Sequence, residues 1–202
     1  MSALTQNAKD CRATEIESSS VREGENPSQI LAQLESQVTR MTAIIAKLRR
    51  RVANDDLTGL LRRGEFFERP ESSVSRRNGD VTIIILDIDD FKRINDSEGH
   101  VVGDHILQRV SEVIRRCNRA GAEVGRFGGE EFVVAVPANQ QTSVALAEAL
   151  RRQIQREVNV TVSVGVATAR QANWETRKMV GMADKALYQA KLAGKNRVRL
   201  AA

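Results

Sequence analysis

Two glycines are followed directly by two carboxylates in the run Gly128-Gly129-Glu130-Glu131-Phe132. Apolar segments at 123–127 and 132–136 flank this run, so it predicts two strands joined by a tight two-residue turn with positive φ at the glycines. Such a turn has no structural use for adjacent acids, which repel each other unless a cation or a donor lies between them. The pair therefore indicates a site for a divalent metal that holds a phosphate.

Asp87 extends this hypothesis to a second strand. It follows Val81–Leu86, whose β-branched or apolar residues on both faces indicate a central strand in a covered sheet. An acid at the end of a buried strand is well placed for a site, because ligands gather at strand termini in such sheets. Asp87 would meet Glu130 only if the two strands are neighbours, which the sequence leaves open. The next two acids, Asp89 and Asp90, are predicted to cap the following helix.

Oxygen ligands without His or Cys would suit Mg²⁺ or Mn²⁺ and a phosphate substrate. The predicted helix Phe91–Asp96 would present free backbone N–H groups in its first turn, beside Asp87, as an anion site. Lys191 and Lys195 lie one turn apart on a predicted helical face and could add positive charge around a triphosphate. Lone lysines of this kind are more often surface residues.

Strand-like and helix-like segments alternate in this part of the chain, which predicts an α/β or α+β domain with a central mixed sheet. Helices are expected at Gly64–Arg69, Phe91–Asp96, Val102–Asn118, Thr142–Gln155 and Thr176–Ala193. Further strands are expected at Val160–Ala167 and, at an edge of the sheet, Val198–Leu200.

The N-terminal part has a different pattern. Residues 1–26 are polar and lack periodicity, so they are predicted to be disordered, and Asn26 is predicted to cap a helix from Pro27. Residues 27–54 show a heptad pattern of apolar residues. This pattern favours a parallel two-stranded coiled coil, and the alternative is a single amphipathic helix packed on its own domain. The apolar residues recur at alternating steps of three and four: Leu31, Leu34, Val38, Met41, Ile45, Leu48 and Val52.

Composition narrows the class of protein. The chain has 202 residues, room for one domain and an appendage, and a net charge of +5 that suits polyanionic partners. Aromatic residues make up only 3% and no nucleic-acid motif is present, which argues against nucleic-acid binding. Cys11 and Cys117 fit neither a disulfide framework nor a zinc site. No apolar run approaches the ~20 residues of a membrane span, so we expect a soluble, cytoplasmic protein without a membrane partner.

Several ordered motifs together resemble the GGDEF-domain diguanylate cyclases, with the variant signature GGEEF. The similarity runs from about Asp55 to Leu200 and is carried by Asp55–Leu60, Leu86–Asp96, Gly99-His100, Gly103-Asp104, Arg126–Phe132, Val162–Ala167, Ala183-Asp184 and Tyr188–Lys191. The resemblance implies a palm-like fold of the nucleotidyl cyclase and polymerase type in a catalytic domain at residues 55–202. It also implies the condensation of two GTP into cyclic di-GMP and two pyrophosphates. Two domains would face each other across a two-fold axis, so that each 3′-hydroxyl attacks the α-phosphate of the opposite GTP.

The resemblance also implies roles for the acidic residues. Asp87, the carbonyl of Ile88 and Glu130 would hold two Mg²⁺ or Mn²⁺ ions in each active site. Glu131 would assist the metal or help to deprotonate the 3′-hydroxyl. Two metal ions held in this way suit in-line phosphoryl transfer, because negative charge develops on the attacking and leaving oxygens.

Nucleotide recognition is implied in the same way. Asn95 and Asp104 match the guanine-binding positions of the family. A carboxylate accepts two hydrogen bonds from the N1–H and amino group of guanine, and adenine offers no such pair, so GTP should be preferred to ATP. The phosphates would be bound by Phe91, Lys92, Lys191 and Lys195. At the last position many relatives have arginine, and lysine keeps the charge without the planar fork.

One family motif is incomplete. Many members carry an Arg-x-x-Asp product-inhibition motif five residues before the signature, and here this window runs from Arg119 to Ala122. The carboxylate that would contact the guanine of the product is replaced by Ala122. We therefore predict weak or absent feedback inhibition through this position.

Two functions remain in competition. The leading hypothesis is an active diguanylate cyclase, because the acids, the guanine pair and both lysines are intact. The alternative is a catalytically silent module that binds GTP or cyclic di-GMP and signals through its N-terminal stalk. In either case we expect a homodimer through the coiled coil, with a regulatory protein on the stalk as a further candidate partner.

Overall fold

The computed structural model describes residues 26–68, 79–117, 121–170 and 175–201. The chain divides into a unit that ends at Ala46 and a larger unit from Lys47 to Ala202. None of the helices in these described ranges is long and apolar enough to cross a membrane.

Helix α1 extends from Pro27 to Ala53. The side-chain carbonyl of Asn26 accepts a hydrogen bond from the N–H of Ser28 at 3.1 Å, which confirms the predicted cap. Several apolar residues of the heptad stripe are exposed to solvent in the single chain, with exposed fractions between 47% and 62%: Leu31, Leu34, Val38, Met41 and Ile45.

The larger unit is built on a mixed sheet. Among the described residues its six strands have the order β1-β3-β4-β2-β5-β6, and the long central strand β2 pairs antiparallel with both β4 and β5. The pairs β1–β3 and β5–β6 are parallel. The strands are β1 (Leu61–Arg62), β2 (Asp80–Ile88), β3 (Glu123–Arg126), β4 (Glu131–Val136), β5 (Val162–Arg170) and β6 (Val198–Leu200).

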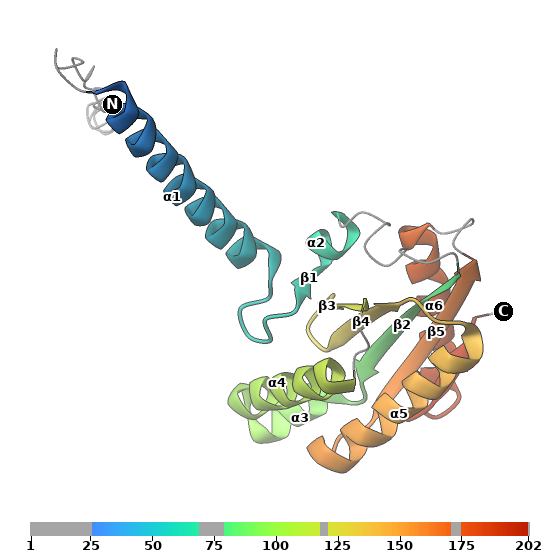
Figure 1. The fold of residues 1–202 in the computed structure, drawn as a ribbon. Helices are drawn as coiled ribbons and strands as arrows, with labels where there is room; N and C mark the ends of the chain where they lie inside the picture. The colour runs from blue at the N-terminus through green and yellow to red at the C-terminus, as the bar shows by residue number, and fades with distance from the viewer. Residues whose placement is uncertain (1–25, 69–78, 118–120, 171–174, 202) are drawn as a thin grey trace, which may run out of the picture. The chain divides into compact units, whose positions relative to one another are not determined.

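Helices cover both faces of this sheet, as the apolar pattern of the central strand predicted (Figure 1). Ile84, Leu86 and Ile88 of β2 pack into a core with α3, α4 and α5. Val81, Ile83 and Ile85 point to the opposite face and pack with α2 and α6. The helices are α2 (Arg63–Glu68), α3 (Phe91–Glu98), α4 (His100–Cys117), α5 (Gln140–Val158) and α6 (Thr176–Leu192).

Helix α6 comes into close contact with the sheet at Gly165 of β5. A methyl group added at this glycine would lie 2.0 Å from the carbonyl oxygen of Ala183 and 2.4 Å from the backbone nitrogen of Leu187. The absence of a side chain at this position therefore sets the distance between α6 and β5, and α6 carries Lys191.

Two local predictions are wrong. The connection between β3 and β4 is longer than a two-residue turn, because Arg126 pairs with Phe132 and the N–H of Phe127 donates to the carbonyl of Glu131. Neither Gly128 nor Gly129 has a positive φ, since the longer loop does not need one. Asp87 lies within β2 rather than beyond its end, because pairing with β4 and β5 continues past Leu86.

Candidate functional site

The pairing of β2 with β4 brings the acidic residues together. Asp87 lies opposite Glu131 in the antiparallel register, and the N–H of Ile88 donates to the carbonyl of Glu130 at 3.3 Å. The two strands whose adjacency the sequence left open are thus neighbours. Three carboxylates and the backbone of Ile88 converge at one end of the central strands.

Asp87 is the most buried of these carboxylates, with 6% of its surface exposed. Burial raises its pKa, because a charged form loses solvation in the interior, and the nearby charges of Glu130 and Glu131 raise it further. The ammonium of Lys191 on α6, 2.7 Å from Oδ2 of Asp87, opposes this shift without cancelling it. Among the described residues, Lys191 is thus the one cation paired with Asp87, while two further carboxylates raise its pKa, and an additional positive charge would relieve this imbalance.

The donor chemistry of this cluster fits a hard divalent cation. Asp87, Glu130 and the carbonyl of Ile88 offer oxygen atoms only, which is the set that Mg²⁺ and Mn²⁺ accept. No group of three or more His, Cys, Asp or Glu side chains is arranged as a metal cage within the described ranges. Magnesium sites commonly combine one or two carboxylates with water and substrate phosphates, so two carboxylates and a carbonyl are compatible with such a site.

Arg126 holds the loop that carries Glu130. Its guanidinium donates to the carbonyl of Gly129 from Nε at 3.2 Å and from Nη2 at 2.7 Å, and Nη1 donates to Oδ1 of Asp55 at 3.0 Å. Burial works to raise the pKa of Asp55, but hydrogen bonds from Thr58 and Arg126 outweigh it and lower that pKa. Arg126 and Asp55 lie within motifs that carry the family resemblance, but the sequence pattern alone indicated no role for either residue.

The two predicted guanine-binding residues lie on helices that pack against each other. Asn95 is on α3 and Asp104 is on α4, where its side chain is exposed. Oδ1 of Asn95 is buried and has no hydrogen-bond partner among the residues that the structure describes. A methyl group at Gly103 would lie only 1.9 Å from this oxygen, so the glycine makes room for Asn95. A buried acceptor without a donor is costly, and a ligand N–H would satisfy it.

The predicted capping role of Asp90 is wrong. Asp90 precedes α3 with a φ of 58°, its side chain makes no cap, and its Oδ1 instead lies 2.6 Å from Nζ of Lys195. This places Lys195 at the N-terminus of α3, where the first-turn N–H groups lack helical partners. In that turn Lys92 is exposed, whereas the side chain of Phe91 is buried in the core.

Asp89 is also not a helix cap. Its carboxylate accepts hydrogen bonds from the hydroxyls of Thr161 and Ser163 and from the backbone N–H of Asn196. The Asp-x-Asp spacing, which places Asp87 and Asp89 on the same side of an extended chain, was the one signal that could have indicated an inward-facing residue.

The incomplete product-inhibition motif is only partly visible. Arg119 lies outside the described residues. Ala122 lies just before β3, is half-buried and packs against the main core. The structure therefore does not test the role predicted for this window.

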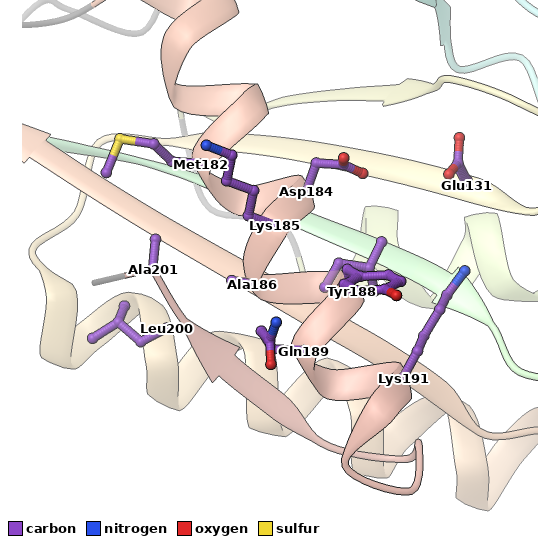
Figure 2. Close-up of a pocket in the computed structure, with 11 residues that line it drawn as sticks. Glu131, Met182, Asp184, Lys185, Ala186, Tyr188, Gln189, Lys191, Leu200 and Ala201 are labelled. Atoms are coloured by element: carbon purple, nitrogen blue, oxygen red, sulfur yellow. The ribbon is translucent and has the colours of Figure 1, made fainter.

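A cavity of about 660 Å³ lies along α6. Figure 2 shows Glu131, Asp184, Tyr188 and Lys191 toward one side of the helix, and Met182, Lys185, Gln189, Leu200 and Ala201 toward the other. Glu131 and Lys191 are shared with the acidic cluster, but Asn95 and Asp104 do not line this cavity. The acidic cluster, rather than the volume of the cavity, therefore defines the candidate active site.

Comparisons with known proteins agree with this arrangement. Residues 52–197 match the family model described as the diguanylate cyclase GGDEF domain. The chain is 39% identical over 165 residues to diguanylate cyclase DgcP of Pseudomonas aeruginosa, a similarity that covers 76% of this chain and 24% of that protein. The chain spans about a quarter to a half of the length of the curated relatives it matches.

Solved structures give the same result. The coiled coil and GGDEF domain of DgcB from Caulobacter crescentus, in complex with c-di-GMP, superimposes with a TM-score of 0.76 at 27% identity and covers 86% of this chain and 98% of that one. Diguanylate cyclase SiaD of Pseudomonas aeruginosa, in complex with its activator SiaC, gives a TM-score of 0.70 at 28% identity and covers 86% and 71%. The family model, the curated relatives and the fold agree, and the chain belongs to the GGDEF family of diguanylate cyclase domains.

Proposed function

We propose that this chain is a diguanylate cyclase, which condenses two GTP into cyclic di-GMP and two pyrophosphates. The observation that carries the proposal is the buried carboxylate of Asp87, which lies opposite Glu131, beside Glu130, and is paired with Lys191. Burial of a charged carboxylate costs free energy of folding, which a purely structural residue would not be expected to incur. Acids with perturbed pKa values in such clusters are typical of functional sites. The reaction itself is inferred from membership of the GGDEF family.

The residues of the site have four tasks. Asp87, Glu130 and the carbonyl of Ile88 would hold divalent metal, and Glu131 would receive or direct the proton of the 3′-hydroxyl. Bound Mg²⁺ or Mn²⁺ would supply a Lewis acid that lowers the pKa of that hydroxyl and offsets the charge on the phosphates. The triphosphate would be bound by Lys191, Lys195 and the first turn of α3, at Phe91 and Lys92. Asn95 and Asp104 would bind the guanine.

The reaction needs two such sites facing each other, and α1 offers a means of pairing them. Its apolar stripe is exposed in the single chain, with Val38 and Met41 each 62% exposed. An exposed heptad stripe is buried when two such helices form a coiled coil. The DgcB structure contains a coiled coil, and SiaD was solved with an activator. We propose a homodimer through α1, with the stalk as a surface for a regulatory partner.

Incubation of the purified protein with GTP and Mg²⁺, followed by chromatography of the products, tests the proposed activity. We expect cyclic di-GMP and pyrophosphate from the native chain and none from the Glu130→Ala/Glu131→Ala double variant. If GTP binds but no product forms, with or without a stalk partner, the chain is the silent binding module instead.

Disruption of the stripe on α1 is expected to lower activity in a way that depends on protein concentration. Val38→Glu places a charge on the stripe, and we expect specific activity at nanomolar protein to fall at least about tenfold, because tethering supplies the second domain at high effective concentration. Activity should recover at micromolar protein. Thr39→Glu is the matched control, since Thr39 is exposed beside the stripe. Deletion of residues 1–50 should act as Val38→Glu does, and unchanged activity with an unchanged dimer would contradict the proposal.

Feedback inhibition by the product is expected to be weak, because Ala122 lacks the carboxylate of the family motif. Cyclic di-GMP titrated into the turnover assay should therefore not inhibit the native chain at low micromolar concentration. Ala122→Asp is expected to increase sensitivity by about tenfold, since a hydrogen bond to a charged group contributes on the order of 1.5–3 kcal/mol. Strong inhibition of the native chain in the low micromolar range would refute this expectation.

A further inference from the structure

We infer that Asp89 is a positioning residue for the triphosphate, which acts by fixing the loop that carries Lys195. This inference rests on the proposed function, because it assigns to Lys195 a nucleotide phosphate as its partner. In this proposal Asp89 acts on the triphosphate through Lys195 and does not contact the substrate itself. Asp89 lies between the proposed metal-binding segment Asp87–Ile88 and the N-terminus of α3, and it reaches from there to the segment after α6.

The carboxylate of Asp89 joins β5 to the loop after α6. Only 6% of Asp89 is exposed. Oδ1 accepts a hydrogen bond from the hydroxyl of Ser163 at 2.6 Å, and Oδ2 accepts one from the hydroxyl of Thr161 at 2.7 Å. Oδ2 also accepts the backbone N–H of Asn196 at 3.0 Å. The N–H of Asp89 donates to the carbonyl of Thr161 at 2.9 Å, so the side chain is fixed to β5 and the backbone to the residue that precedes β5.

The loop that Asp89 holds has an unusual backbone. Gly194, Lys195 and Asn196 all have positive φ, at 106°, 59° and 43°. Asparagine adopts this conformation readily, but in lysine it persists only where the surroundings enforce it. The side chain of Asn196 is held as well, because its Oδ1 accepts from Nη1 of Arg151 at 2.7 Å. The N–H groups of Gly194 and Lys195 also donate to the carbonyls of Lys191 and Ala190, at 3.2 Å and 3.1 Å. Asp89 is therefore one of several contacts that maintain this loop.

The enforced loop determines where Lys195 lies. Its ammonium is 2.6 Å from Oδ1 of Asp90, the residue that follows Asp89 and precedes α3. A lysine has a long flexible stem, so the position of its charge depends on its ion-pair partner as well as on its backbone. Without the anchor at Asn196, the N–H of Lys195 would still donate to the carbonyl of Ala190 at 3.1 Å, but the backbone that follows Lys195 would be free to move. We expect the ammonium then to be held less firmly beside the first turn of α3.

A structural role alone would stabilise the fold without any preference for the phosphates of the ligand. A thermodynamic cycle separates the two roles, since residues that act through one another give non-additive effects. The cycle compares the native chain with Asp89→Asn, Lys195→Met and the double variant, each as the full chain in the presence of Mg²⁺. The probe is a GTP analogue with a methylene group between the α- and β-phosphorus atoms, measured by titration calorimetry. GMP, which lacks the outer phosphates, is the matched ligand.

We expect Asp89→Asn to raise the Kd of the analogue about tenfold and the Kd of GMP less than twofold. The double variant should bind the analogue no more weakly than Lys195→Met alone. Asn196→Pro removes the N–H that Asp89 accepts and forces φ to be negative, and it should show the same pattern. This second variant leaves the contacts of Asp89 with β5 in place, so it keeps the test decisive if Asp89→Asn does not fold.

Four results would overturn the inference. Additive losses in the double variant, or equal losses for the analogue and GMP, would reduce Asp89 to a structural residue while the proposed function remains intact. Normal binding by Asn196→Pro would show that the loop does not position Lys195. A native chain that binds neither GTP nor the analogue would instead overturn the proposed function, and this inference with it.

Discussion

Asp87→Asn is expected to lower the rate of cyclic di-GMP formation by about three orders of magnitude, as losses of preorganised electrostatic stabilisation do. The substitution keeps the shape of the side chain and removes its negative charge. The proposed metal site would lose one of its two carboxylates, and Lys191 would lose its ion-pair partner. The rate should be measured at saturating GTP over a range of Mg²⁺ concentrations, so that weakened metal binding is separated from slower chemistry.

Asp80→Asn is the matched control for Asp87→Asn, because Asp80 begins the same strand at the end away from the site. It removes the same charge from β2, and we expect its rate to stay within about twofold of the native chain, as surface substitutions usually have small effects. An Asp87→Asn variant that retains native rates at every Mg²⁺ concentration would contradict the assignment of Asp87 as a metal ligand.

Gly165→Ala is expected to destabilise the fold by about 3 kcal/mol or more, at or beyond the upper end of typical overpacking costs. The new methyl group would lie 2.0 Å and 2.4 Å from backbone atoms of α6, and backbone atoms cannot rotate away as a flexible side chain can. Relief of the clash therefore requires α6 to move away from β5, which would shift Lys191 relative to Asp87. Urea unfolding of the native chain and the variant measures the loss through the change in midpoint at constant slope.

Gly181→Ala provides the contrast on α6 itself. No atom of the described residues lies within 4 Å of a methyl group added at Gly181, and the residue is exposed within the helix. Alanine is a better helix former than glycine, so we expect this substitution to stabilise the fold by about 0.5–1 kcal/mol. If both substitutions had the same small effect, contact between α6 and β5 would not limit stability.

Much of the fold of the larger unit could be predicted because its signals are local. The apolar residues of β2 indicated a strand covered on both faces, and the edge strand β6 was predicted with its observed bounds, Val198–Leu200. The helical periods of α5 and α6 were recognised, although α5 extends several residues beyond its predicted ends. Ends of elements depend on caps and tertiary packing rather than on periodicity, which is why they were less accurate.

The candidate site depends on contacts that periodicity does not encode. Strand order decided whether Asp87 would face Glu131, and the order β4-β2-β5 arises from pairing between distant segments. Asp89 was predicted to be a cap because Asp before a helix usually is one, but its partners are 72 to 107 residues away in sequence. The two glycines of the signature were assigned to the commonest short turn, whereas the register of β3 with β4 leaves a longer loop.

The contact between Arg126 and Asp55 affects how such a domain can be joined to different N-terminal segments during evolution. Asp55 follows the end of α1 by two residues, and Arg126 joins it to the carbonyl next to Glu130. All three partners lie inside the segment that matches the family model, while the curated relatives extend that segment to very different total lengths. A gene fusion that exchanges everything before Asp55 would therefore transfer this connection intact. Recombination could supply new N-terminal modules without having to evolve a fresh attachment to the signature loop each time.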